Sequence, residues 1–127
     1  MVENFLHEDL SYKIRGACFN VYNTLGGGHK ESIYQKALAI EFEKSGVKFE
    51  REKSLTISYE NEKIGVYRPD FVVNGEVIIE LKAVEFMAKD FEVQLLNYLK
   101  STKFALGFLI NFGPKKVEIR RRVNFYK

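Results

Sequence analysis

The sequence predicts a single domain of mixed α/β fold over residues 1–127, in which a central mixed β-sheet of about four core strands is flanked by helices in the order ααββββαββ. Three observations lead to this prediction. The chain has 127 residues, the usual length of one domain, and no repeat or linker-like stretch divides it. Apolar residues recur at helical spacing in three segments and at strand spacing between them. The run 104–112 is almost wholly apolar, as expected of a strand covered on both faces.

Two helices are predicted at the start of the chain, on either side of a glycine triplet. The first has helical spacing of the apolar residues Leu10, Ile14, Ala17, Val21 and Leu25. The triplet Gly26-Gly27-Gly28 ends it. The second helix is expected from about Lys30 to Ser45, where Gly46 supplies a left-handed cap.

The middle of the chain alternates between apolar and polar residues. This pattern predicts strands over 47–51, 55–59, 64–73 and 76–83. Asn74-Gly75 between the last two of them indicates a hairpin. The expected fold is completed by a third helix over 89–100 and by strands over 104–112 and 117–121.

The composition excludes several classes of protein. With 46% hydrophobic and 29% charged residues the chain is neither disordered nor of low complexity, and its net charge of +3 is too small to indicate a partner. No apolar run approaches the ~20 residues of a membrane helix, and the first residues lack the layout of a signal peptide, so we expect a soluble cytoplasmic protein. The single cysteine, Cys18, cannot form an internal disulfide, and no Cys and His cluster has zinc-site spacing.

Three carboxylates stand where the patterns predict the core. Glu31 falls at the end of the apolar stripe of the second helix, where the helix dipole alone would also favour an acid. Asp70 and Glu80 lie among apolar strand residues and must be neutralised. Two interpretations are open. One is a structural ion pair of either acid with Arg68 or Lys82, and the other is a divalent cation held by both acids, with Lys82 directed at a phosphate.

The register of the hairpin decides whether the two strand carboxylates can share a site. A two-residue Asn74-Gly75 loop would pair Asp70 with Ile79 and direct Glu80 to the other face of the sheet. We therefore predict a longer loop, or a bulge near Pro69, which cannot donate a hydrogen bond to a neighbouring strand.

Three short motifs are familiar in combination. Pro69-Asp70, followed after nine residues by Glu80-Leu81-Lys82, resembles the PD-(D/E)xK signature of the restriction-endonuclease-like nuclease superfamily. The segment 28–34 matches G-x-x-E-x-x-Y, and Gln94 with Tyr98 matches Q-x-x-x-Y. Together with the strand "GFLINFG" and the basic C-terminal segment, these motifs resemble the GxxExxY protein family of that superfamily over about residues 11–123.

The resemblance implies a restriction-endonuclease-like core and a metal site. Lys82 would orient or deprotonate the attacking water and stabilise charge on the phosphorane. Gln94 would assist catalysis by holding the site, and Tyr98 would contact the nucleic acid. Carboxylate oxygens suit Mg²⁺ or Mn²⁺ better than zinc. The metal ligands implied by the family pattern are Glu31, Asp70, Glu80 and the carbonyl of Leu81.

The C-terminal segment 115–127 holds six basic residues against one acid. A solvated edge strand uses such residues to prevent aggregation, and a surface that binds phosphates uses them as contacts. Both interpretations stay open. The candidate nucleic-acid contacts in this segment are Lys115, Lys116, Arg120, Arg121 and Arg122.

These features predict an enzyme that hydrolyses phosphodiester bonds with Mg²⁺ or Mn²⁺, on DNA rather than RNA. The alternative is a non-catalytic module that binds nucleic acid or protein and retains the nuclease fold. The presence of Asp70, Glu80 and Lys82 together favours the enzyme, because buried charges are costly to keep without a use. The small size of the domain suggests a homodimer, since two-fold pairing would double the phosphate contacts.

Overall fold

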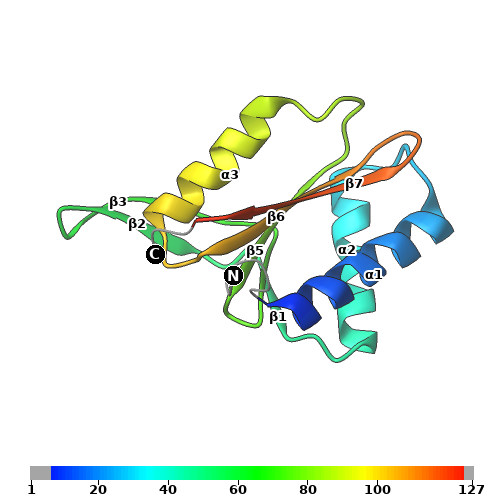
Figure 1. Ribbon diagram of the computed structural model, residues 1–127, viewed down its shortest axis with the longest axis horizontal. Coiled ribbons are helices and arrows are strands. Elements are labelled where there is room, and N and C mark those ends of the chain that lie inside the picture. The colour runs from blue at the N-terminus through cyan, green and yellow to red at the C-terminus, as the bar shows by residue number, and fades with distance from the viewer. Residues whose placement is uncertain (1–6, 125–127) are drawn as a thin grey trace.

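The computed structural model describes residues 7–124. It contains a mixed β-sheet with helices on both faces and a separate hairpin (Figure 1). The elements in chain order are α1 (Glu8–Leu25), α2 (Glu31–Lys44), β1 (Phe49–Arg51), β2 (Leu55–Tyr59), β3 (Glu62–Tyr67), β4 (Phe71–Val73), β5 (Val77–Lys82), α3 (Lys89–Ser101), β6 (Leu106–Phe112) and β7 (Val117–Val123). The mixed α/β fold with a helix-flanked central sheet is therefore confirmed.

The main sheet has five strands in the order β1-β4-β5-β6-β7. Among the strands of residues 7–124, only β5 and β6 pair in parallel, and α3 is the crossover between them, as a parallel connection requires. Helices α1 and α2 cover one face of the sheet and α3 covers the other (Figure 1). All seven residues of β6 are buried, which confirms the prediction of a strand covered on both faces.

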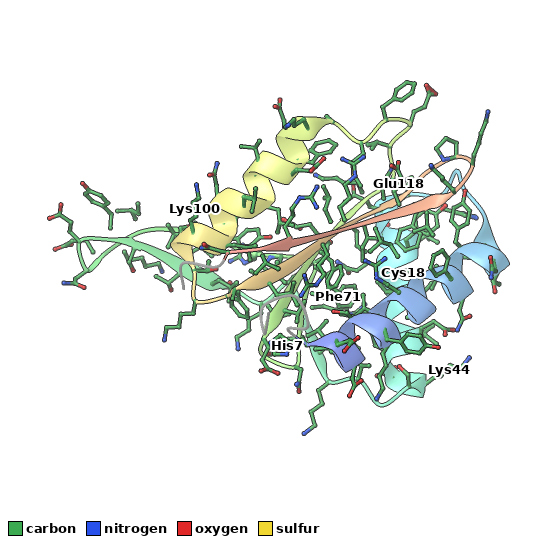
Figure 2. All side chains as sticks on the ribbon, in the orientation of Figure 1. His7, Cys18, Lys44, Phe71, Lys100 and Glu118 are labelled. Atoms are coloured by element: carbon green, nitrogen blue, oxygen red, sulfur yellow. The ribbon has the colours of Figure 1, made fainter. Side chains whose placement is uncertain are left out.

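The larger core lies between the sheet and the pair α1 and α2. Phe71 is fully buried near the centre of the molecule (Figure 2), with its ring centroid 5.2 Å from that of Phe42 and 5.6 Å from that of Phe49. Cys18 is also fully buried, and this burial raises the pKa of its thiol. No helix among residues 7–124 combines the length and the apolar character needed to cross a membrane.

The strand predicted over 64–73 is wrong as one element. The structure divides it into β3, which pairs with β2 in a separate two-stranded sheet, and β4, which joins the main sheet. The break falls at Arg68-Pro69-Asp70, because proline lacks an N–H group and restricts the residue before it. The order is therefore ααβββββαββ, with five strands before α3 where four were predicted.

The hairpin between β4 and β5 has the longer loop that the sequence predicts. Val73 pairs with Val77, so three residues connect the strands, and the ladder ends with Phe71 opposite Ile79. Continuing this register by one residue places Asp70 level with Glu80. The two carboxylates can therefore approach each other without a bulge.

The glycine triplet packs closely against the turn between β6 and β7. Gly26 has a positive φ of 67°, and its N–H donates to the carbonyl of Tyr22, where α1 ends. A Cβ atom on Gly27 would lie 2.6 Å from the carbonyl oxygen of Gly113, so only glycine fits there without a shift. The Tyr22 hydroxyl donates a hydrogen bond of 2.7 Å to the same carbonyl. As a result α2 begins close to the end of β6.

Candidate active site

The structure brings Glu31, Asp70, Glu80 and Lys82 together near the C-terminal end of β5. Glu80 and Lys82 alternate with the core residues of β5 and therefore lie on the face covered by α3. Asp70 directly precedes β4, and Glu31 is the first residue of α2. Partial burial of the carboxyl and the Asp70 carboxylate raise the pKa of Glu31, whereas the Lys82 ammonium acts to lower it. Asp70 and Lys82 act in the same way on Glu80, so both glutamates lie within reach of the Asp70 and Lys82 charges.

Asp70 is held by hydrogen bonds from two elements. The backbone N–H of Leu81 donates to Oδ2 at 2.8 Å, and the Gln35 side-chain amide donates to Oδ1 at 2.8 Å. Gln35 lies four residues after Glu31 on α2, so both side chains face the same side of that helix. Asp70 is therefore fixed between β5 and α2.

Glu80 is held from the opposite side. The Tyr67 hydroxyl donates a hydrogen bond of 2.7 Å to Glu80 Oε2. The Tyr67 ring stacks on that of Tyr98 in α3, with centroids 3.6 Å apart and planes 6° from parallel. Burial raises the pKa of Glu80 to about 7; the Tyr67 hydrogen bond opposes this rise and the Asp70 carboxylate adds to it.

Lys82 rests against an aromatic ring of α3. Its Nζ lies 4.3 Å from the centroid of the Phe91 ring, a cation–π contact that holds the ammonium against α3. In the part of the chain that the structure describes, no ion pair joins Asp70 or Glu80 to Lys82 or Arg68. Arg68 donates instead to Ser54 Oγ at 2.8 Å. The structural ion pair is therefore not formed.

Tyr34 explains why the segment 28–34 places Glu31 where it does. The Tyr34 hydroxyl donates to the carbonyl of Gly26 at 2.6 Å and accepts a hydrogen bond from the His29 N–H at 3.2 Å. Its ring stacks on Phe112 at the end of β6, with centroids 4.4 Å apart. These contacts fix the first turn of α2 to the sheet and hold Glu31 beside the strand carboxylates.

The carboxylate oxygen atoms of Glu31, Asp70 and Glu80 are suitable ligands for a hard divalent cation. No basic side chain among residues 7–124 forms an ion pair with Asp70 or Glu80. Their carboxylate oxygens are the kind of ligand that Mg²⁺ and Mn²⁺ prefer. Glu31 is exposed at the rim. Within the described part of the chain, however, no three His, Cys, Asp or Glu side chains are arranged as a ready metal cluster. The pair Asp70 and Glu80 is therefore the part of the predicted ligand set that fits best.

The two residues of the Q-x-x-x-Y motif on α3, Gln94 and Tyr98, differ in their surroundings. Gln94 is exposed on α3 and makes no hydrogen bond to the carboxylates. Tyr98 is half-buried and supports Tyr67 through the ring stack. Sequence reasoning missed Gln35 and Tyr67, the two residues that hold the carboxylates. The position of Gln35 one turn after Glu31 was a usable signal, whereas Tyr67 was hidden in the strand that the structure divides.

The predicted basic residues divide into three groups. Lys115 and Lys116 are exposed in the turn between β6 and β7. Arg120 and Arg122 both pair with Glu92 of α3, and these arginines lower the pKa of its carboxyl. Arg121 lies on the opposite face of β7 from Arg120 and Arg122. Lys127, the sixth basic residue of the segment 115–127, lies outside the described residues. The basic segment is thus partly neutralised by a neighbouring helix.

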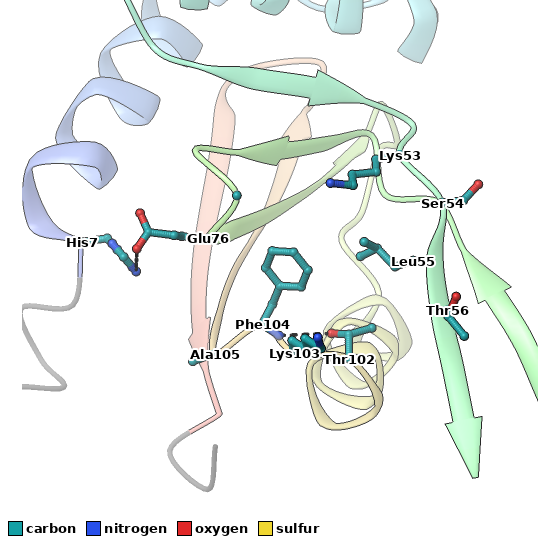
Figure 3. Close-up of a pocket in the computed structure, with 11 residues that line it drawn as sticks. His7, Lys53, Ser54, Leu55, Thr56, Glu76, Thr102, Lys103, Phe104 and Ala105 are labelled. Atoms are coloured by element: carbon teal, nitrogen blue, oxygen red, sulfur yellow. Dashed lines mark hydrogen bonds and ion pairs between the residues drawn. The ribbon is translucent and has the colours of Figure 1, made fainter. Parts of the chain in front are cut away.

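A cavity of about 550 Å³ lies at the other end of β5, away from the carboxylates (Figure 3). The imidazole of His7 approaches Glu76 at its edge, at 3.6 Å. Its wall contains none of the predicted site residues. The residues that line it are His7, Lys53, Ser54, Leu55, Thr56, Gly75, Glu76, Thr102, Lys103, Phe104 and Ala105.

A family model described as the PD-(D/E)XK nuclease superfamily matches residues 8–122. The matched segment includes all three helices and every strand except the last residue of β7. No curated protein and no solved structure matches the chain significantly.

Proposed function

Because the chain belongs to the PD-(D/E)XK nuclease superfamily, we propose that it is a metal-dependent nuclease that hydrolyses phosphodiester bonds of DNA at the site formed by Asp70, Glu80 and Lys82. One observation carries the proposal. The three-residue connection between β4 and β5 sets a register in which Asp70 and Glu80 meet beside Lys82. A nuclease-like hydrolase needs carboxylates and a cation converging in this way on one phosphate.

The side chains have separate tasks in this proposal. A bound Mg²⁺ or Mn²⁺ would activate water and stabilise the extra negative charge on the phosphate. Asp70 and Glu80 would hold that ion, with Glu31 and the Leu81 carbonyl as further ligands. Gln35 and the Leu81 N–H orient Asp70, and Tyr67 orients Glu80. Lys82, steadied by the Phe91 ring, orients the attacking water or accepts its proton.

Substrate contacts come from outside the carboxylate pair. Lys115 and Lys116 are free to meet phosphates because they are exposed in the turn between β6 and β7. DNA rather than RNA is the proposed substrate, and Tyr98 and Gln94 are proposed to support its placement. The proposed homodimer would double these phosphate contacts, and light scattering after size-exclusion chromatography measures it.

The test is cleavage of linear, branched and single-stranded DNA and RNA with Mg²⁺ or Mn²⁺. Lys82→Ala and Asp70→Ala should each lose at least ~100-fold in rate, since each removes a group at the reacting phosphate. Lys44→Ala is the matched control, because Lys44 is an exposed lysine at the end of α2 that pairs with Glu41 at 3.5 Å, away from the carboxylates.

Two results would contradict the proposal. Cleavage that survives both substitutions would come from a contaminant. A wild-type protein that binds Mn²⁺ but cleaves no substrate would be the non-catalytic binding module instead.

A further inference from the structure

A second cavity, of about 620 Å³, lies beside the candidate active site. It opens between the connection from β5 to α3 and the turn from β6 to β7. Phe86 stands on the first of these segments, and Lys115 and Lys116 stand on the second. Glu118 of β7, labelled in Figure 2, forms part of its wall.

The sheet register fixes the distance between this cavity and the catalytic lysine. Lys82 pairs with Asn111 on β6, and Asn111 pairs with Glu118 on β7. Neighbouring strands are about 4.8 Å apart, so the backbone of Glu118 lies roughly 10 Å from the backbone of Lys82, two strands away across the sheet. A nucleotide that flanks a phosphate at Lys82 would reach the cavity.

Asn111 also holds the first wall of the cavity in place. Its side chain is fully buried, accepts a hydrogen bond from the Val84 N–H at 2.9 Å and donates one to the Val84 carbonyl at 3.0 Å. These two bonds tie the chain after Lys82 to β6. Phe86, two residues further on, is therefore held near the lysine turn.

The lining has the chemistry of a groove for single-stranded nucleic acid. Phe86 is 80% exposed, so its ring offers an open face on which a base can stack. Lys115 and Lys116 offer two cations to the backbone phosphates. The charge of Glu118 is offset by Arg120 at 3.3 Å, which leaves Glu85 as the only uncompensated acid among the lining residues.

Resting on the nuclease function proposed above, we propose that this cavity binds a single-stranded stretch of DNA next to the scissile phosphate, with a base stacked on Phe86 and phosphates on Lys115 and Lys116. A duplex hides the faces of its bases in its own stack, so it cannot use Phe86 in this way. The cavity thus selects single-stranded or unpaired DNA.

The test is fluorescence anisotropy with a labelled oligothymidylate and a duplex of equal length, with Ca²⁺ in place of Mg²⁺ to prevent cleavage. The wild-type protein should bind the single strand more tightly, and Phe86→Ala should weaken that binding about tenfold, the effect of losing one stacked base. Phe86→Trp should restore it. Phe19→Ala is the control, because Phe19 is 48% exposed on α1 at the other face of the sheet.

The lysines supply a second measurement. The logarithm of the affinity for a single strand falls with the logarithm of the salt concentration, with a slope of about −0.7 for each phosphate that the protein neutralises. Replacing Lys115 and Lys116 by alanine should therefore make this slope shallower by about 0.7 for each lysine that binds a phosphate.

Two outcomes would overturn the inference, namely equal affinity of wild type and Phe86→Ala, or tighter binding of the duplex. Binding through Phe86 without cleavage on addition of Mg²⁺ would refute the nuclease proposal and leave the binding site standing.

Discussion

The Tyr67 hydroxyl donates a hydrogen bond of 2.7 Å to Glu80 Oε2 and so connects the separate β2–β3 hairpin to the strand that carries the candidate active site. Tyr98 of α3 stacks on the same tyrosine. A hydrogen bond to a carboxylate stabilises its charged form, whereas burial disfavours it. The hairpin therefore acts on the charge of Glu80 as well as on its position.

Tyr67→Phe should weaken metal binding. The substitution removes the hydroxyl donor and keeps the ring that stacks on Tyr98, so the pKa of Glu80 should rise further. We expect a loss of Mn²⁺ affinity of at least about tenfold near neutral pH, because a hydrogen bond to a charged group is worth ~1.5–3 kcal/mol. Titration of free Mn²⁺ by electron paramagnetic resonance measures this loss. Tyr59→Phe, at an exposed position on the same hairpin, should bind as wild type does; equal affinity of both variants would refute the role of Tyr67.

The stability of the metal-free protein should depend on pH through Glu80. Its pKa is about 7 in the folded chain against an ordinary 4.5, so the folded state keeps a proton that the unfolded state releases between these values. Stability from this group is complete below about pH 4.5 and falls as the pH rises to about 7, by at most about 3 kcal/mol.

Glu80→Gln isolates this contribution. Urea unfolding in chelator at pH 5 and at pH 7.5 should show the fall in wild type and a smaller one in Glu80→Gln. Other groups, such as Glu92 with its lowered pKa, titrate equally in both proteins. If the free energy of unfolding changed with pH by the same amount in both proteins, Glu80 would be ionised in the folded protein throughout this pH range.

Gly27→Ala should destabilise the fold. Its Cβ would lie 2.6 Å from the Gly113 carbonyl oxygen and 2.8 Å from the Pro114 Cα, both on a backbone that cannot simply turn aside. We expect a loss of about 1–3 kcal/mol, the usual effect of overpacking. Gly16→Ala on α1 is the matched control, because a Cβ there meets nothing within 4 Å and alanine favours a helix by about 1 kcal/mol. Urea denaturation should therefore give opposite signs for the two variants, and the same sign would contradict the close packing.

Glu92→Gln should strengthen the binding of nucleic acid. Glu92 pairs with both Arg120 and Arg122, so its neutralisation frees Arg122 from its ion pair, leaves Arg120 paired with Glu118 alone and removes one negative charge. Affinity for a DNA oligonucleotide should increase several-fold at low salt, with a steeper dependence on salt. Asp90→Asn, an exposed acid in the first turn of the same helix, is the control. Weaker binding by Glu92→Gln alone would show that the ion pairs position the arginines instead.

Much of the fold follows from the sequence because helix and strand periods depend on near neighbours. The apolar spacing predicted α1, α2 and α3 to within a few residues, and the burial of β6 was evident from its composition. The division of residues 64–73 was not predicted. Alternation continues on both sides of Pro69, so the pattern does not show that β3 pairs with β2 in a separate sheet while β4 joins the main sheet.

The sequence by itself determined which residues could carry the chemistry, because the spacing of Asp70, Glu80 and Lys82 is a local property of one hairpin. The tertiary structure alone decided what surrounds them. Gln35 reaches Asp70 across 35 positions of the chain, and Glu92 meets Arg120 across 28. Such contacts depend on how α2 and α3 dock on the sheet, and docking reflects the packing of whole elements, which no local pattern records.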